Sequence, residues 1–144
     1  MTTTVKFTTV GLADANLLRG RGKKSFETWV IDLAQRGCRA LDYRLTGTAP
    51  VDRLCVKHLF GQLRTVVSFD DEGVAWIVAV GPHDENDAER NIYTRLWKLC
   101  GLDAPPTGER TKPSCCGSGG TPPEFAEEVD DLVIRCNQTV RRRR

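Results

Sequence analysis

The segment VKHLFGQLRTVVSF, residues 56–69, predicts the centre of the fold. On each side of Gly61 the residues separate into two alternating sets, which is the pattern of strands that place every second side chain on one face. Glycine takes the backbone of a tight turn without steric cost, so Gly61 is the natural turn residue. We expect an antiparallel hairpin in which Lys57 and Arg64 face one side of the sheet and His58 lies at the rim of the core.

Three other segments predict further strands. ALDYRLTG (40–47) indicates a short strand before the hairpin, and TVKFT (4–8) alternates in the manner of a first strand. DDEG (70–73) is typical of a turn, and VAWIVAV (74–80) after it is apolar throughout. A continuous apolar run of this length predicts a central strand that is covered on both faces.

Helical spacing predicts the elements that cover this sheet. Phe26, Trp29, Val30, Leu33 and Ala34 recur at the positions of one helix face, and Gly37 follows as a typical end of the helix. An apolar segment at 12–19 precedes this helix, and GRG (20–22) between them predicts a break. The N-terminal third therefore indicates a strand followed by a helical hairpin.

The C-terminal half predicts two more helices. Residues 87–100 indicate a closing helix, residues 105–124 a Pro/Gly/Ser-rich linker, and residues 125–144 a short amphipathic helix with an acidic face and an arginine tail. The predicted fold class is α+β, with the N-terminal strand and helical hairpin packed on a small, mainly antiparallel sheet, a closing helix and an extra C-terminal helix. We expect residues 1–104 to form the main domain.

Composition indicates a soluble globular protein of 144 residues, with 40% hydrophobic and 28% charged residues. The net charge is only +2, yet 15 of the 21 basic residues are arginine, the better fork for phosphate. A bias of the genome toward arginine is an equal explanation. The longest apolar run is too short for a membrane span, and the N-terminus resembles no secretion signal, so we expect a cytoplasmic protein.

The six cysteines form no CxxC pair. In the cytoplasm disulfides are rare, so we expect thiols, with Cys38, Cys55 and Cys100 as small core residues. Cys115 and Cys116 lie together in the predicted linker, where a zinc site is a weak alternative. We expect no metal and no cofactor.

Four side chains at the expected end of the sheet suggest chemistry. Lys57, Arg64, His83 and Tyr93 would lie at one face or edge, since His83 follows the strand at 74–80 and Tyr93 lies in the closing helix. RNA cleavage without a metal needs a base for the ribose 2′-OH, a cation for the phosphate and an acid for the 5′-oxygen. Taken singly, each of the four has an ordinary structural explanation: a solvated strand residue, a turn histidine or a tyrosine at the core rim.

The order of these elements resembles the RelE/ParE superfamily of bacterial type II toxins. VKHLFGQLRTVVSF is similar to the central hairpin of the family, WIVAVGPHD to its last strand, and NIYTRL to the segment that opens its closing helix. The resemblance is closest over residues 40–99 and covers well over half of the chain. Two features depart from the family: acidic residues at 84–89 separate His83 from Tyr93, and the segment after Pro105 has no counterpart.

The resemblance implies a toxin that cleaves mRNA, on the ribosome or free, as a metal-independent endoribonuclease. By position, Lys57 and Arg64 would act on the phosphate, His83 would stand where many members carry a basic residue, and Tyr93 would stack on the substrate or take part in proton transfer. It also implies a cognate antitoxin that forms a hetero-oligomer with the toxin. As RNA-binding residues we expect Arg90, Arg95, Arg141 and Arg142. The alternatives are a ParE-like inhibitor of DNA gyrase and an inactive module that binds RNA or protein.

Overall fold

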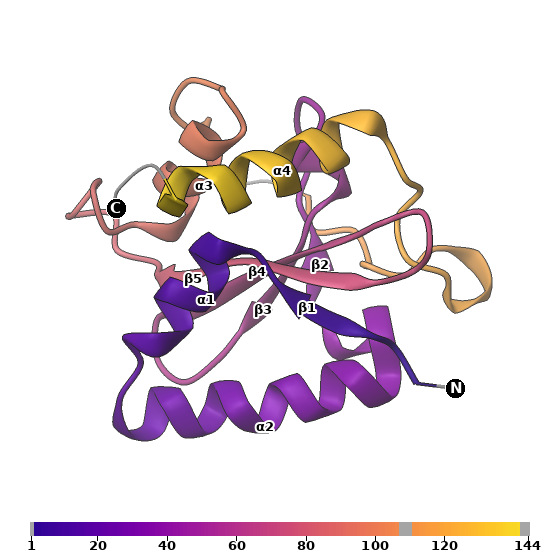
Figure 1. The fold of residues 1–144 in the computed structure, drawn as a ribbon, viewed down its shortest axis with the longest axis horizontal. Coiled ribbons are helices and arrows are strands. Elements are labelled where there is room, and N and C mark those ends of the chain that lie inside the picture. Colours follow the sequence, from indigo (N-terminus) through magenta and orange to yellow (C-terminus); the bar gives the residue numbers. More distant parts are fainter. Residues whose placement is uncertain (1, 107–110, 142–144) are drawn as a thin grey trace.

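A computed structural model describes residues 2–106 and 111–141, with the backbone alone at 138–141. It confirms the α+β class: a five-stranded sheet is covered by helices on both faces (Figure 1). The order along the chain begins with β1 (Val5–Phe7), α1 (Thr9–Asn16) and α2 (Gly20–Arg36), which are the predicted strand and helical hairpin. Among the described residues no helix is long and apolar enough to cross a membrane.

The sheet has the strand order β1-β5-β4-β3-β2. Its centre is the predicted hairpin of β3 (Cys55–His58) and β4 (Leu63–Phe69), which pair antiparallel. β5 (Ala75–Pro82) lies between β4, its antiparallel neighbour, and β1, its parallel neighbour. The predicted strand at 40–47 is reduced to the two residues of β2 (Tyr43–Arg44) at the sheet edge.

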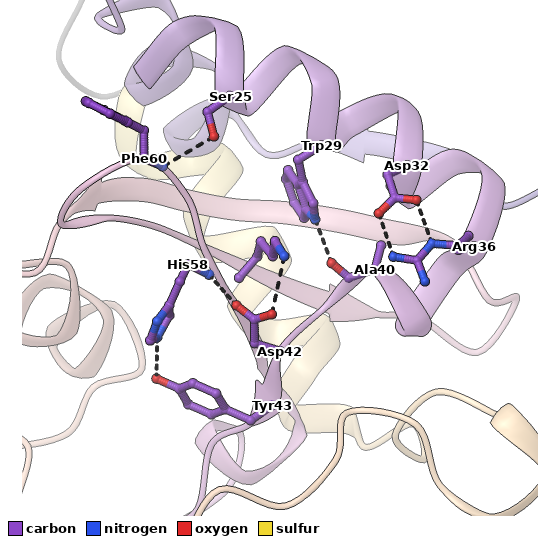
Figure 2. A network of polar contacts seen from close by, with 10 residues as sticks. Ser25, Trp29, Asp32, Arg36, Ala40, Asp42, Tyr43, His58 and Phe60 are labelled. Carbon is purple, nitrogen blue, oxygen red and sulfur yellow. Dashed lines mark hydrogen bonds and ion pairs between the residues drawn. The ribbon is translucent and has the colours of Figure 1, made fainter. Parts of the chain in front are cut away.

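One face of the sheet is covered by α2. Phe26, Trp29 and Leu33 of this helix are buried and pack in one core cluster with Cys55 and Val67 of the sheet. Trp29 Nε1 donates a hydrogen bond of 2.9 Å to the carbonyl of Ala40, which fixes the chain after the helix (Figure 2). The predicted break at residues 20–22 is wrong, because α2 begins at Gly20 and runs through GRG. The break lies instead at residues 17–19, between the two helices.

The opposite face is covered by α1, α3 (Ile92–Leu99) and α4 (Glu127–Arg141), which lie across the sheet from α2 (Figure 1). Val66 and Val78 of the sheet, Leu96 of α3 and Leu132 of α4 are buried in one cluster. The C-terminal helix therefore shares the core of the N-terminal elements. The closing helix is shorter than the predicted 87–100, because residues 84–91 form a hydrogen-bonded loop before it.

Residues 111–121 of the predicted linker, which we call the strap, are attached to the rest of the protein by two disulfides. Cys55–Cys115 joins the strap to β3, and Cys38–Cys116 joins it to the turn after α2. The expectation of thiols is wrong for these four cysteines, and the weak alternative of a zinc site there is not met. Cys100 at the end of α3 and Cys136 of α4 stay as buried thiols, and burial raises the pKa of each to about 12. Cys115 and Cys116 reach their disulfide partners because the strap folds back onto the body of the protein, although 60 and 78 residues separate the bonded cysteines in the sequence.

Candidate active site

A cleft of about 920 Å³ opens at the end of the sheet that α3 borders. Its walls come from β2, the hairpin of β3 and β4, the loop after β5, the first turns of α3 and the strap. The side chains that line it include Tyr43, His58, Arg64, His83, Tyr93 and Lys112, together with Thr46, Glu85, Asn91, Thr94, Trp97 and Thr111. Three of the four catalytic candidates from the sequence lie here; the fourth, Lys57, does not.

The register of the hairpin separates Lys57 from Arg64. Residues equally far from Gly61 are paired, so His58 lies opposite Arg64 and Lys57 lies opposite Thr65. Side chains alternate along a strand, and Lys57 therefore points to the face that α2 covers. There it contacts Asp42, with 3.3 Å between Nζ and Oδ1. The expectation that Lys57 and Arg64 share one face is wrong, and His58 takes the place beside Arg64.

His58 is held between β2 and the cleft. Its backbone nitrogen donates a hydrogen bond of 2.7 Å to Oδ2 of Asp42, and its Nε2 lies 3.1 Å from the hydroxyl of Tyr43 (Figure 2). The ring of Tyr43 meets the imidazole edge to face, with 5.4 Å between centroids. Desolvation lowers the pKa of His58, and the positive charge of Arg64 lowers it further. The ring is therefore neutral near pH 7 and able to accept a proton.

Two tyrosines connect His58 to His83. The hydroxyls of Tyr43 and Tyr93 lie 3.0 Å apart, and the ring of Tyr93 meets the imidazole of His83 edge to face at 4.9 Å. Burial raises the pKa of Tyr93 well above its ordinary value, and the bond to Tyr43 raises it further, while Arg64 opposes the change. Tyr93 thus keeps its proton at neutral pH. The chain of contacts places both histidines in one wall of the cleft.

Arg64 supplies a buried positive charge with spare hydrogen-bonding capacity. Only 8% of the residue is exposed, and Nη1 donates to the carbonyls of Gly61 and Leu63 at 3.2 and 3.1 Å. Its Nε has no hydrogen-bond partner among the described residues. A buried donor of a charged group without a partner is costly, and an anion in the cleft would satisfy it. The hairpin turn thus orients a guanidinium for a phosphate or carboxylate.

The acidic residues between His83 and Tyr93 mostly build the loop that joins them. Asp84 Oδ1 accepts from the backbone of Asn86, and the carbonyl of Asp87 accepts from the nitrogens of Arg90 and Asn91. Glu85 is the exception, since Oε1 lies 3.5 Å from Nε2 of His83 and forms an ion pair when the imidazole is protonated. The loop thus keeps the rings of His83 and Tyr93 in contact, although nine residues separate them in the sequence.

The arginines expected to bind RNA have different surroundings. Arg95 is engaged by the fold, because Nη2 lies 2.9 and 2.8 Å from the two carboxylate oxygens of Asp14 in α1. Arg90 is exposed in the loop before α3. The side chain of Arg141 and the whole of Arg142 lie outside the described residues. RNA contact by all four arginines stays a prediction, and in the fold Arg95 joins α3 to α1.

Tyr43, His58 and Lys112 are the cleft residues that the sequence analysis did not select. His58 was interpreted as a histidine of the core rim, although it and Arg64 are each three residues from Gly61. That equal spacing was the available signal, because a hairpin turn centred on glycine pairs equidistant residues. No comparable signal existed for Tyr43 or for Lys112 of the strap, since both reach the cleft through contacts distant in sequence.

The cleft combines two imidazoles, two phenols and a guanidinium. Such groups can exchange protons near neutral pH and stabilise a developing negative charge, which suits acid–base chemistry at a phosphate ester. Among the described residues, no three histidine, cysteine, aspartate or glutamate side chains are close enough to hold a metal ion. Within this set, Arg64, His83 and Tyr93 are the catalytic candidates from the sequence that line the cleft, and their catalytic roles stay predictions.

No protein-family model matches the sequence, and no curated protein is similar to it. Solved structures do match. The RelBE2 toxin–antitoxin complex of Mycobacterium tuberculosis has a chain that is 22% identical, with a TM-score of 0.46 over 56% of this chain and 96% of that chain.

Two more solved structures are similar. A mutant of the E. coli toxin RelE in the free state is 16% identical, with a TM-score of 0.47 over 60% of this chain and 88% of that chain. The archaeal RelE-RelB complex from Pyrococcus horikoshii is 20% identical, with a TM-score of 0.44 over 59% and 99%. At these identities and TM-scores the likeness carries no argument about function.

Proposed function

We infer that this chain is the toxin of a type II toxin–antitoxin system and that it cleaves RNA in the cleft beside α3. The observation that carries the proposal is the meeting of His58, Arg64 and His83 in one cleft, joined by the Tyr43–Tyr93 pair. These elements are distant in sequence, and the groups that they bring together are those that cleavage through the ribose 2′-OH requires.

In this mechanism His58 acts as the base. Its neutral imidazole takes the proton of the 2′-OH, and the 2′-oxygen forms a bond to the adjacent phosphorus. The bond from phosphorus to the 5′-oxygen breaks, and protonated His83 gives its proton to that oxygen. The products are a 2′,3′-cyclic phosphate and a free 5′-OH. A depressed pKa suits His58 to the role of base, and Oε1 of Glu85 lies 3.5 Å from Nε2 of His83, where it pairs with the imidazolium.

Arg64 stabilises the charge that builds on the phosphate. Arg64 lies on β4, between β3, which carries His58, and β5, which His83 follows, and its burial keeps the local dielectric low, which strengthens the interaction. The hydrogen bonds to Gly61 and Leu63 fix the guanidinium before the substrate arrives, so little reorganisation is needed. Tyr93 keeps its proton and acts by position, as a surface on which a base stacks and as a support for His83.

The proposal includes an antitoxin partner. Two of the similar structures are toxin–antitoxin complexes. We expect a cognate antitoxin to bind this chain in a hetero-oligomer and to keep RNA from the cleft, and we place the active toxin in the cytoplasm with its mRNA and the ribosome. Inhibition of DNA gyrase by binding and an inactive module that binds RNA or protein are the competing functions.

The test is cleavage of a single-stranded RNA by the purified chain in the presence of a metal chelator. We expect products with 2′,3′-cyclic phosphate ends, and no product where one 2′-deoxy nucleotide replaces the nucleotide at the cleaved position. Arg64→Lys keeps the positive charge but loses the planar guanidinium that can donate two parallel hydrogen bonds, and it should lower the rate about 10²-fold. His83→Gln should lower the rate by about as much.

Two results would overturn the assignment. Cleavage at the normal rate by both variants would remove Arg64 and His83 from the chemistry. Intact RNA together with loss of DNA supercoiling by gyrase would identify the gyrase inhibitor, and intact RNA that is nevertheless bound would identify the inactive module.

A further inference from the structure

The strap, residues 111–121, crosses the edge of the sheet next to the cleft. It is attached at two points, since Cys115 is bonded to Cys55 of β3 and Cys116 to Cys38 of the turn after α2. Cys115 is buried, with 3% of the residue exposed. The strap is therefore bound covalently to the strand that also carries His58.

Backbone contacts fix the strap on both sides of the disulfides. The carbonyl of Pro113 accepts a hydrogen bond of 2.8 Å from the nitrogen of Arg44 in β2, which extends the sheet edge by one bond. Beyond the cysteines, Gly117 donates to the carbonyl of Thr121 at 2.7 Å and closes a tight loop. A Cβ added to Gly120 would come within 2.6 Å of Nη2 of Arg39, so the loop rests closely on the body of the protein.

The attached strap brings a second cation to the cleft. Nζ of Lys112 lies over the ring of Tyr43, 5.2 Å from its centroid, and Lys112 lines the cleft together with Thr111 and Arg64. An ammonium above an aromatic face is held by the ring quadrupole but keeps its charge toward solvent. The charge of Lys112 is also felt by His58, whose pKa it helps to lower. Lys112 precedes the first cysteine of the strap by three residues, so the disulfides hold the segment that carries it against the sheet edge.

We propose that Lys112 positions RNA by binding a phosphate next to the scissile one, and that the two disulfides of the strap make this binding dependent on the redox state. The proposal rests on the proposed function. With the disulfides formed, Arg64 and Lys112 present two cations along one wall of the cleft. With the disulfides reduced, the strap loses both covalent attachments and Lys112 is no longer held beside Tyr43.

The redox step needs a dithiol reductant. One reductant thiolate attacks a sulfur of Cys55–Cys115, the disulfide bond breaks, and one cysteine leaves as a thiolate while the other forms a mixed disulfide with the reductant. The second thiol of the reductant then attacks the reductant sulfur of that mixed disulfide, which releases the second cysteine and forms the disulfide of the reductant. Two electrons and two protons pass to the protein for each disulfide, which leaves two thiols, and the reductant is oxidised to a disulfide. The same exchange opens Cys38–Cys116.

The test measures binding of a single-stranded RNA that has 2′-O-methyl groups and cannot be cleaved, by fluorescence anisotropy at several salt concentrations. Wild-type protein, Lys112→Ala and the double variant Cys115→Ser/Cys116→Ser are each compared before and after treatment with dithiothreitol. Lys98→Ala is the control, because Lys98 is exposed in the last turn of α3 and does not line the cleft. Circular dichroism checks that each sample is folded.

Loss of one phosphate contact should lower the slope of log K against log salt by about 0.7 for a single strand. We expect this loss for Lys112→Ala in the oxidised protein, for the reduced wild type and for the double cysteine variant. Once the protein is reduced, Lys112→Ala should change neither the slope nor the affinity. Lys98→Ala should match the wild type in both states.

Three results would overturn the inference. Equal binding by oxidised and reduced wild type would show that RNA binding does not depend on the redox state. An equal effect of Lys112→Ala in both states would show that the disulfides do not position the lysine. Unfolding on reduction would show that the disulfides only stabilise the fold. In these cases RNA cleavage by the wild type still stands. Failure of the wild type to bind or cleave RNA in either redox state would instead overturn the proposed function and the inference together.

Discussion

The two faces of the sheet are built from the same strands but carry different kinds of side chain beside Gly61. On the face under α2, Lys57 pairs with Asp42 at the rim of an apolar cluster that includes Leu33 and Val67. On the face under α3, His58 and Arg64 open into the cleft. The first face is covered by α2, a single helix of 17 residues. The second is covered by α1, α3 and α4, and only the eight-residue α3 borders the end of the sheet where the cleft opens.

A first prediction compares adjacent residues of β3 that point to opposite faces. His58→Gln should lower the rate of RNA cleavage by about 10²- to 10⁴-fold, because the amide keeps a hydrogen bond to Tyr43 but cannot accept the proton. Lys57→Ala should leave the rate unchanged, since its side chain lies across the sheet from the cleft. Single-turnover cleavage of one RNA by both variants measures the difference. Equal losses in the two variants would mean that Lys57 contributes to cleavage as much as His58, although the two side chains point to opposite faces of the sheet.

A second prediction concerns the face under α2, whose contribution is stability. Leu33 has no exposed surface, so Leu33→Ala should lower the free energy of unfolding by about 2–5 kcal/mol through lost burial and a residual cavity. The folded fraction should cleave RNA at the normal rate. Denaturant unfolding gives the first quantity and the cleavage assay the second. The matched control is Ile31→Ala on the same helix, where 62% of the residue is exposed and a change within about 0.5 kcal/mol is expected.

A third and smaller effect is the dependence on pH. Because burial and the charge of Arg64 lower the pKa of His58, the acid-side fall of the cleavage rate, where His58 becomes protonated, should lie below about pH 6.5, the ordinary value for histidine. The folded protein holds this proton less tightly than the unfolded chain, so the contribution of His58 to stability is present above the unfolded pKa. It is lost as the pH falls through the folded pKa.

Two measurements check this effect. NMR titration of His58 should give a midpoint below that of a histidine in an unfolded peptide, and Arg64→Lys should leave the midpoint low because the positive charge is kept. A midpoint above the peptide value would contradict the burial of this ring beside the two cations of the cleft.

Much of the fold was readable from local patterns. The hairpin around Gly61, the apolar strand after it and the spacing of Phe26, Trp29 and Leu33 each reflect a face that must be buried, and burial imposes a period on the sequence. Local patterns predict the ends of helices less well. GRG lies inside α2, because a helix that packs its later turns on the sheet tolerates glycine in its first turn. The strap was interpreted as a linker because its Pro/Gly/Ser composition carries no period.

The sequence by itself determined the residue types that meet in the cleft and the strands that carry them. Arg64, His83 and Tyr93 were identified because each occupies a marked place, beside a turn, after a strand or at the start of a helix. The tertiary structure alone decided that His58 and not Lys57 joins them, that Tyr43 links the two histidines, and that four cysteines bind the strap to the sheet. The physical reason is that these contacts join residues far apart in the chain, where only packing and register set the distance.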